Sequence, residues 1–110
     1  MNYSIQITRT AEQDLNSAAD HIEFVLHNPA AADNLLDEAE KRIGGLSSFP
    51  EKFALVSDPF LKGLGIHFIT IKNYLAFYTI SHDEKKVYII RFLYGKRDWQ
   101  NILKHDFSLN

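Results

Sequence analysis

Alternating apolar and polar positions open the chain and then give way to helical spacing. Tyr3, Ile5 and Ile7 alternate with polar residues, which predicts a half-buried strand. Thr10, followed three residues later by Gln13, predicts the capped start of a helix. One apolar stripe then recurs at helical spacing, through Ala11, Leu15, Ala18, Ala19, Ile22 and Leu26. We therefore expect a strand followed directly by an amphipathic helix.

A second helix follows after a short polar break. Asn28 is a good capping residue, and Pro29 suits the first helical position. A second apolar stripe follows, made of Ala32, Leu35, Leu36, Ala39, Ile43 and Leu46. Because the break is short, the two helices are expected to form an antiparallel hairpin.

The second half of the chain has the composition of strands. Residues rich in β-branched and aromatic side chains predict strands at 53–57, 66–72, 74–81 and 86–95, with a glycine-containing flexible loop at 58–65. Tight turns at Asn73 and at 82–85 would join the last three strands into an antiparallel meander. Both faces of these strands are largely apolar, so one face would pack on the helices and the other must also be covered.

The chain closes with a short predicted helix at 98–105. Asp98 is its possible cap, and Trp99, Ile102 and Leu103 are expected to point inward. The order is therefore β-α-α-β-β-β-β-α, an α+β fold in one domain spanning residues 1–110, with a helical hairpin packed on a small curled antiparallel sheet. The first strand is expected to join this sheet as an edge or beside the last strand.

Composition restricts the class of protein. The chain has 110 residues, 45% of them hydrophobic, and no cysteine, so a disulfide framework and a thiolate metal site are both excluded. No apolar run approaches the roughly 18 residues of a membrane span, and the first residues lack the pattern of a signal peptide. We expect a cytoplasmic protein that does not enter a membrane.

Charge is distributed unevenly along the chain. The formal net charge is −2, but residues 1–60 carry −6 and residues 61–110 carry +4. This asymmetry predicts a polarised surface, although an acidic helical half that is simply solvated would give the same numbers. The second half contains a basic set of candidate binding residues, which are Lys62, His67, Lys72, Arg91, Lys96, Arg97, Lys104 and His105.

Two of these cations raise a choice between structure and function. Arg91 lies within a strand, on the predicted face of Val87, Ile89 and Leu93, where a charge must be paired or must serve a binding role. Arg97 follows the strand end, where it could pair with the next residue or bind a phosphate or an acidic segment. His67 suits proton transfer near neutral pH but also suits an ordinary strand position.

Other kinds of site have little support in the sequence. The histidines are poorly spaced for a metal, and neither a phosphate-binding glycine loop nor a nucleotide fingerprint occurs. We therefore expect no metal and no cofactor.

Several motifs in this order resemble one known family. They are TAEQDL at the first helix, Phe49-Pro50 after the second, Tyr74 and Tyr78 in one strand, and YIIRFLYGKRDW at 88–99. Together they resemble the RelE/ParE superfamily of toxins from bacterial type II toxin-antitoxin modules, which are also described as plasmid stabilisation proteins. The resemblance spans nearly the whole chain and implies a growth-inhibiting toxin.

The superfamily implies two alternative mechanisms. RelE-like members cleave mRNA on the ribosome, whereas ParE-like members are regarded as non-nucleolytic inhibitors of DNA gyrase. The nucleases carry lysines where this chain has Ile66 and Phe68, an arginine at Leu75, and a tyrosine near Leu103. Their arginine after the strand end is matched by Arg97. The resemblance therefore favours ParE-like action, with a RelE-like endoribonuclease as the alternative.

The resemblance also implies a site and partners. A nuclease of this kind could use His67, Lys72 and Arg97 as a substitute catalytic set. The residues expected to contact the target or the antitoxin are Arg91, Tyr94, Lys96, Arg97 and Trp99. The expected partners are a cognate acidic antitoxin, which both apolar sheet faces and the cationic edge would suit, and either gyrase or the ribosome with mRNA. A homodimer of the free toxin could hide the same surface.

Overall fold

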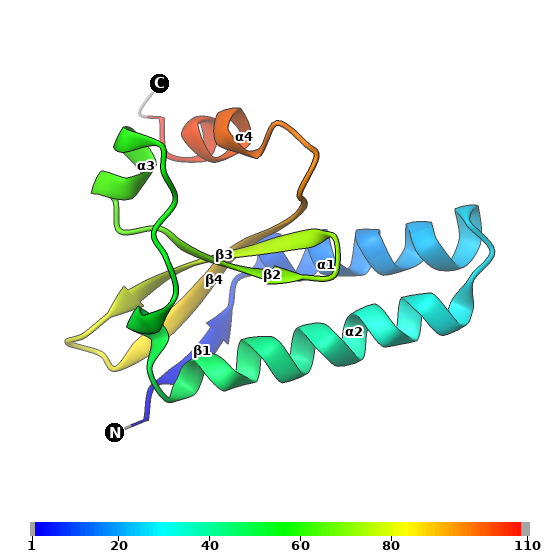
Figure 1. Cartoon of the computed structure of the whole chain (residues 1–110), viewed down its shortest axis with the longest axis horizontal. Helices are drawn as coiled ribbons and strands as arrows, with labels where there is room; N and C mark the ends of the chain where they lie inside the picture. The colour runs from blue at the N-terminus through cyan, green and yellow to red at the C-terminus, as the bar shows by residue number, and fades with distance from the viewer. Residues whose placement is uncertain (1, 109–110) are drawn as a thin grey trace.

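A computed structural model describes residues 2–108 of the chain. Figure 1 shows four strands, β1 (Ser4–Ile7), β2 (His67–Ile71), β3 (Tyr74–Ser81) and β4 (Lys86–Tyr94), and four helices, α1 (Arg9–Asp20), α2 (Pro29–Gly44), α3 (Pro59–Gly63) and α4 (Trp99–Asp106). A π-helical stretch, His21–Val25, extends α1, and two 3₁₀ turns lie at Gly45–Ser47 and Pro50–Lys52. No helix within residues 2–108 is long and apolar enough to cross a membrane.

The strands form one sheet in the order β1-β4-β3-β2. The meander β2-β3-β4 is antiparallel, as predicted. β1 lies at the edge beside β4, which the sequence also indicated, but it runs parallel to β4, so the sheet is mixed. The parallel pairing arises because α1 follows β1 directly and crosses the sheet face. The α+β class predicted from the sequence is confirmed.

Each face of the sheet has its own hydrophobic core. On one face the α1–α2 hairpin packs its alanine-rich stripe against Ile69, Ile71 and Tyr78, among others. We call this the first core. On the other face α3, α4 and the segment before β2 pack around Phe77 and Leu93, which form the second core. The chain thus covers both faces itself. The apolar sheet faces are not left open for an antitoxin, which corrects one argument made from the sequence.

The two long helices begin at side-chain caps. Asn28 Oδ1 accepts a hydrogen bond from Ala31 N at 3.1 Å, and Pro29 occupies the first turn, as predicted. α1 instead has its cap two residues before the predicted one, because Thr8, and not Thr10, accepts from Ala11 N. The Thr8 hydroxyl also donates to Ile89 O at 2.9 Å, so contact with β4 selects this cap.

The segment between α2 and β2 differs most from the prediction. The strand expected at 53–57 is reduced to a single bridge between Leu55 and His67. The expected flexible loop contains α3, since Asp58 caps it by accepting from Leu61 N at 3.1 Å, and Pro59 takes its first position. The segment folds over the sheet in this way because Val56 and Leu61 are fully buried in the second core.

A β-bulge changes the alternation of β4. Tyr78 pairs with Ile89, but Phe77 pairs with Arg91, so Ile90 is an extra residue on β4. Before the bulge the odd-numbered positions of β4, Val87 and Ile89, face the first core. After the bulge the odd-numbered positions face the second core, where Leu93 is buried. The prediction that Arg91 shares the face of Val87 and Ile89 is therefore wrong.

The terminal helix confirms its predicted inward face. Leu103 is fully buried, and Trp99 and Ile102 pack partly buried against the second core. Asp98 precedes the helix but accepts from the Asn101 side chain at 2.6 Å and does not cap the backbone.

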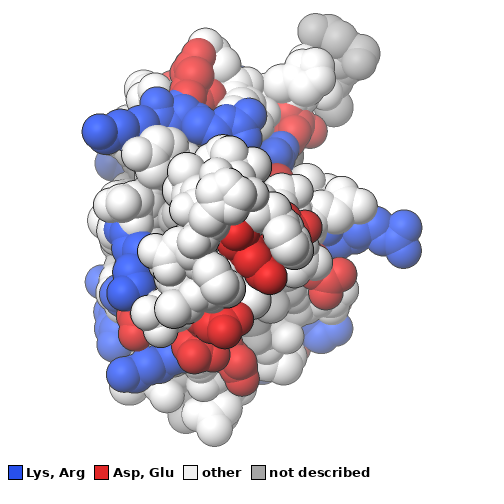
Figure 2. All heavy atoms as spheres, turned by 90° about the vertical axis from the view of Figure 1, so that its right-hand side faces the viewer, with Lys and Arg blue, Asp and Glu red and all other residues white. Residues whose placement is uncertain are grey.

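The helical hairpin reaches beyond the end of the sheet, on the right of Figure 1. Figure 2 faces this end of the molecule. Acidic side chains lie at its centre and below, within a largely uncharged surface, and basic side chains lie along the left margin, above, and at the right edge. The overhang creates a hollow under the hairpin that the sheet does not fill.

Candidate functional site

The groove under the overhanging hairpin, which we call the Arg97 groove, has a volume of about 640 Å³. It is lined by His21, Ile22, Leu26, Asn28 and Ala31 from the hairpin and by Asn73, Tyr74, Tyr94 and Arg97 from the sheet end. The site is therefore made by three segments that are distant in the sequence. It includes two of the five residues predicted to contact a target or an antitoxin, Tyr94 and Arg97.

Arg97 is positioned by a tight turn at the end of β4. Arg97 N donates to Tyr94 O at 3.0 Å, and Gly95 N donates to Asn73 O at 2.8 Å, which ties this turn to the β2–β3 turn. A Cβ at position 95 would lie 3.2 Å from Asn73 O, so glycine allows this close approach. The Arg97 side chain is exposed, and no ion pair involves it among residues 2–108.

Two tyrosines line the groove beside Arg97. The Tyr74 ring stacks on Phe92, with centroids 5.1 Å apart, and meets Tyr94 edge to face at 5.5 Å. Burial raises the pKa of the Tyr74 hydroxyl above its ordinary value, and Tyr94 adds to the rise. Tyr74 is therefore a neutral phenol at physiological pH, able to donate a hydrogen bond or stack but poorly suited to act as a base.

Lys72 lies next to the Arg97 groove, in a hollow that shares residues with it. It occupies the β2–β3 turn with a positive φ of 56° and lines a smaller hollow of about 200 Å³ against α2. That hollow shares Asn73 and Tyr74 with the Arg97 groove. Two of the three residues named as a possible catalytic set, Lys72 and Arg97, are thus neighbours of the same tyrosine.

His67 lies at the other end of β2. Lys72 follows it five positions later, a distance of about 16 Å along a strand. Its Nδ1 donates to Phe53 O at 2.8 Å, and its ring stacks on Tyr78 with centroids 5.1 Å apart. The structure therefore does not bring His67 together with Lys72 and Arg97.

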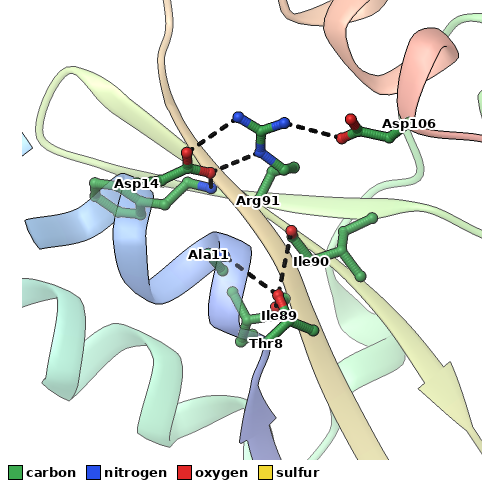
Figure 3. Close-up of polar contacts among 8 residues, drawn as sticks. Thr8, Ala11, Asp14, Ile89, Ile90, Arg91 and Asp106 are labelled. Atoms are coloured by element: carbon green, nitrogen blue, oxygen red, sulfur yellow. Dashed lines mark hydrogen bonds and ion pairs between the residues drawn. The ribbon is translucent and has the colours of Figure 1, made fainter. Parts of the chain in front are cut away.

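Arg91 is held by two carboxylates. Figure 3 shows its guanidinium between Asp14 of α1 and Asp106 of α4. Asp14 binds it through both oxygens, at 2.7 and 3.0 Å, and also accepts from Phe92 N at 3.0 Å. Asp106 accepts from Nη1 at 3.0 Å. These hydrogen bonds raise the pKa of Arg91 despite its partial burial, so it stays charged and joins α1, β4 and α4.

The remaining predicted contact residues divide between surface and core. Lys96 is exposed beside Arg97. Trp99 packs its ring on Phe77, with centroids 5.1 Å apart, within the second core. Of the five predicted contact residues, Tyr94, Lys96 and Arg97 therefore have exposed side chains, whereas Arg91 and Trp99 pack against neighbouring elements.

Sequence reasoning missed the contribution of the hairpin to the groove. His21, Asn28 and Ala31 line it, although the histidine was considered only as a metal ligand and the asparagine only as a cap. Asn73 was noted only as a turn residue. These residues lie together only because the helical hairpin is longer than the strands and overhangs the end of the sheet. No group of histidines and carboxylates within residues 2–108 is arranged to hold a metal ion.

The fold is similar to that of chains solved in toxin-antitoxin complexes. One similar solved structure is described as the chromosomal ParDE TA system from P. aeruginosa, with a TM-score of 0.70, 20% identity, and 86% of this chain and 97% of that chain covered. Another is the RelBE2 toxin-antitoxin complex from Mycobacterium tuberculosis, with a TM-score of 0.59, 20% identity, and coverages of 86% and 99%. Both likenesses concern the fold.

The sequence identifies the family. Residues 5–99 match the family described as the ParE toxin of the type II toxin-antitoxin system parDE. No curated protein is similar enough in sequence to match. Because the family match covers most of the chain, this protein belongs to the ParE toxin family, within the RelE/ParE superfamily that its motifs resemble.

Proposed function

We propose that this chain inhibits growth without cutting RNA, that DNA gyrase is its target, and that a cognate antitoxin neutralises it. The observation that carries the proposal is the chemistry around Arg97. The groove offers one cation, two tyrosines and the His21 ring, whereas His67 of the predicted catalytic set is about 16 Å away from Lys72 along β2 and bound to a backbone carbonyl. A docking surface fits these groups better than a reaction centre does.

The positions that carry cations in RelE-like nucleases support this proposal. Ile66 is fully buried here, and Phe68 and Leu75 pack half-buried against the second core. RNA cleavage needs an acid, a base and charge stabilisation of the phosphate, each contributing roughly 10²-fold or more. Side chains that build the core cannot supply these groups.

The exposed cations give the groove its proposed binding role. Arg97 presents a planar fork of donors that matches a carboxylate or a phosphate, and Lys96 and Lys72 extend the positive charge on either side. An acidic antitoxin tail and an acidic segment of the target would both be attracted to this surface. We infer that the antitoxin neutralises the toxin by covering it.

A second candidate function is RelE-like cleavage of mRNA on the ribosome. One observation favours it: the His21 imidazole lines the groove together with Arg97, Tyr74 and Tyr94, so a cation, a titratable ring and stacking surfaces face one space. Such a nuclease would use His21 in place of His67. His21→Ala would then abolish activity, whereas a docking surface would lose only one contact.

Two purified assays separate these functions. Wild-type toxin should inhibit supercoiling by gyrase and leave ribosome-bound mRNA uncut. Arg97→Ala should weaken the inhibition at least about tenfold, as loss of a charged contact would. Arg42→Ala is the matched control, because Arg42 is exposed in the last turn of α2, far from the groove. Ribosome-dependent cleavage by the wild type, lost in His21→Ala, would instead establish the nuclease.

A further inference from the structure

The end of the helical hairpin carries three large apolar side chains in succession. Phe24, Val25 and Leu26, which we call the hairpin tip, are 64%, 61% and 59% exposed. Leu26 N donates to His21 O at 3.1 Å, which closes the π-helical turn, and His27 then adopts a positive φ of 53°. Such turns and strained residues are often found at functional sites. An apolar surface of this kind favours a partner.

The tip lies beside a hollow that could receive an apolar side chain. Leu26 belongs to the tip and also lines the Arg97 groove, together with Ile22, Ala31 and Tyr74. The protruding hairpin tip and the Arg97 groove are therefore adjacent on the same end of the molecule. An interface related by a two-fold axis needs a surface that is complementary to itself, and this pairing meets that requirement.

The charges around the tip and the groove have opposite signs. Asp20 and Glu23 flank the tip on the hairpin, and Lys72 and Arg97 flank the groove on the sheet side. None of these four takes part in an ion pair within the described part of the chain. Figure 2 shows side chains of both signs on this end of the molecule. A uniformly acidic partner would satisfy the basic side alone.

We propose that this end of the molecule binds a second copy of the same chain. In a two-fold dimer the hairpin tip of each copy would enter the Arg97 groove of the other, and Asp20 and Glu23 of each would face Lys72 and Arg97 of the other. Each unpaired charge thereby gains an opposite neighbour. A net charge of −2 per chain opposes this association only weakly.

The size of the surface agrees with this arrangement. The molecule measures 42 × 36 × 22 Å, and Figure 2 looks along its longest dimension onto the 36 × 22 Å end. Stable interfaces of standard size bury about 800 Å² per partner. One end face of this protein is therefore large enough for a specific dimer.

The dimer would regulate the surface proposed to bind the target. It would cover Arg97, so free toxin would mask its own docking surface until gyrase or the antitoxin displaced the second copy. This consequence rests on the proposed function, but the dimer contact itself does not. Failure of the gyrase proposal would leave the sedimentation results below unchanged.

Sedimentation of the full chain at micromolar concentration tests the contact. The wild type should sediment as a dimer and Phe24→Asp as a monomer. Phe49→Asp is the matched control, since Phe49 is 74% exposed but lies after the opposite end of α2, and it should remain dimeric. A monomeric wild type, or a Phe24→Asp variant that stays dimeric, would overturn the proposal.

A charge exchange tests the arrangement of the two copies. Asp20→Lys/Glu23→Lys and Lys72→Glu/Arg97→Glu should each associate at least about tenfold more weakly than the wild type, because like charges then meet. In an equimolar mixture the reversed charges become complementary at both contacts, so dimers should return. Circular dichroism checks that each variant is folded. Folded variants that do not recover in the mixture, or that dimerise alone, would rule out this geometry.

Discussion

Arg91 and Arg97 lie six positions apart, one within β4 and one just beyond it, and their surroundings are opposite. Arg91 is bound by Asp14 and Asp106, and its side chain is 15% exposed. Arg97 is exposed beside a groove with no ion-pair partner among residues 2–108. A charge within the layers of a fold must be neutralised, whereas a charge beyond the strand end keeps its hydration. The comparison teaches that Arg91 serves the fold and leaves Arg97 available for a partner.

The largest expected effect comes from removing the main partner of Arg91. Asp14→Ala should lower the free energy of unfolding by about 3 kcal/mol, because it leaves Arg91 and Phe92 N without their acceptor. Urea unfolding measures this change in the free energy of unfolding. Asp37→Ala, an exposed acid on α2, should change stability by less than about 0.5 kcal/mol. Equal effects in the two variants would mean that Arg91 is not held as described.

A smaller effect is expected at the turn that positions Arg97. Gly95→Ala should destabilise by about 1 kcal/mol, because the new Cβ crowds Asn73 O at 3.2 Å. Gly63→Ala is the matched control, since a Cβ there has no atom within 4 Å and alanine favours the helix. Thermal unfolding compares the two. A neutral Gly95→Ala variant would show that the two turns are not held together this closely.

The contact between α3 and α4 gives a pH dependence. Asp58 accepts a hydrogen bond from Lys104 at 2.7 Å and caps α3, and these contacts lower the pKa of its carboxyl group. A lowered pKa in the folded state adds stability above the unfolded pKa, and that stability is lost as the pH falls through the folded value. The Asp58→Asn variant should therefore lose less stability than the wild type when the pH is lowered, whereas the Asp83→Asn variant should lose as much as the wild type. Urea midpoints across the acid range decide this.

The smallest effect on stability is expected at Arg97. Arg97→Ala should change the free energy of unfolding by less than about 0.5 kcal/mol, because its side chain is exposed and outside any ion pair of the described residues. The same variant should lose most of its toxicity on induction. A folded Arg97→Ala toxin of full potency would reduce Arg97 to a solvated surface charge.

Much of the fold could be predicted because its signals are local. The helical hairpin follows from two apolar stripes and from Asn28-Pro29, and the meander follows from three β-rich runs separated by turns. The cap of α1 was misplaced because Thr10 and Gln13 fit the capping pattern, whereas contact with β4 favours Thr8. For α3 a readable signal was present in Asp58-Pro59, but the glycines nearby indicated a loop.

The site was harder to predict because it depends on distant segments. The face of Arg91 could not be read from alternation, since the bulge at Ile90 is visible only in the pairing with β3. The Arg97 groove arises where a long hairpin overhangs a short sheet, so His21 and Asn28 gave no signal of their own. Arg97 itself was found because a cation directly after a strand end is a feature of the sequence.

Induced expression with separate readouts of DNA and protein synthesis tests the central claim most directly. The account predicts that DNA synthesis stops first while transcripts remain intact, and that Arg97→Ala removes this effect while Arg42→Ala retains it. An early stop of translation accompanied by cut transcripts would contradict the account.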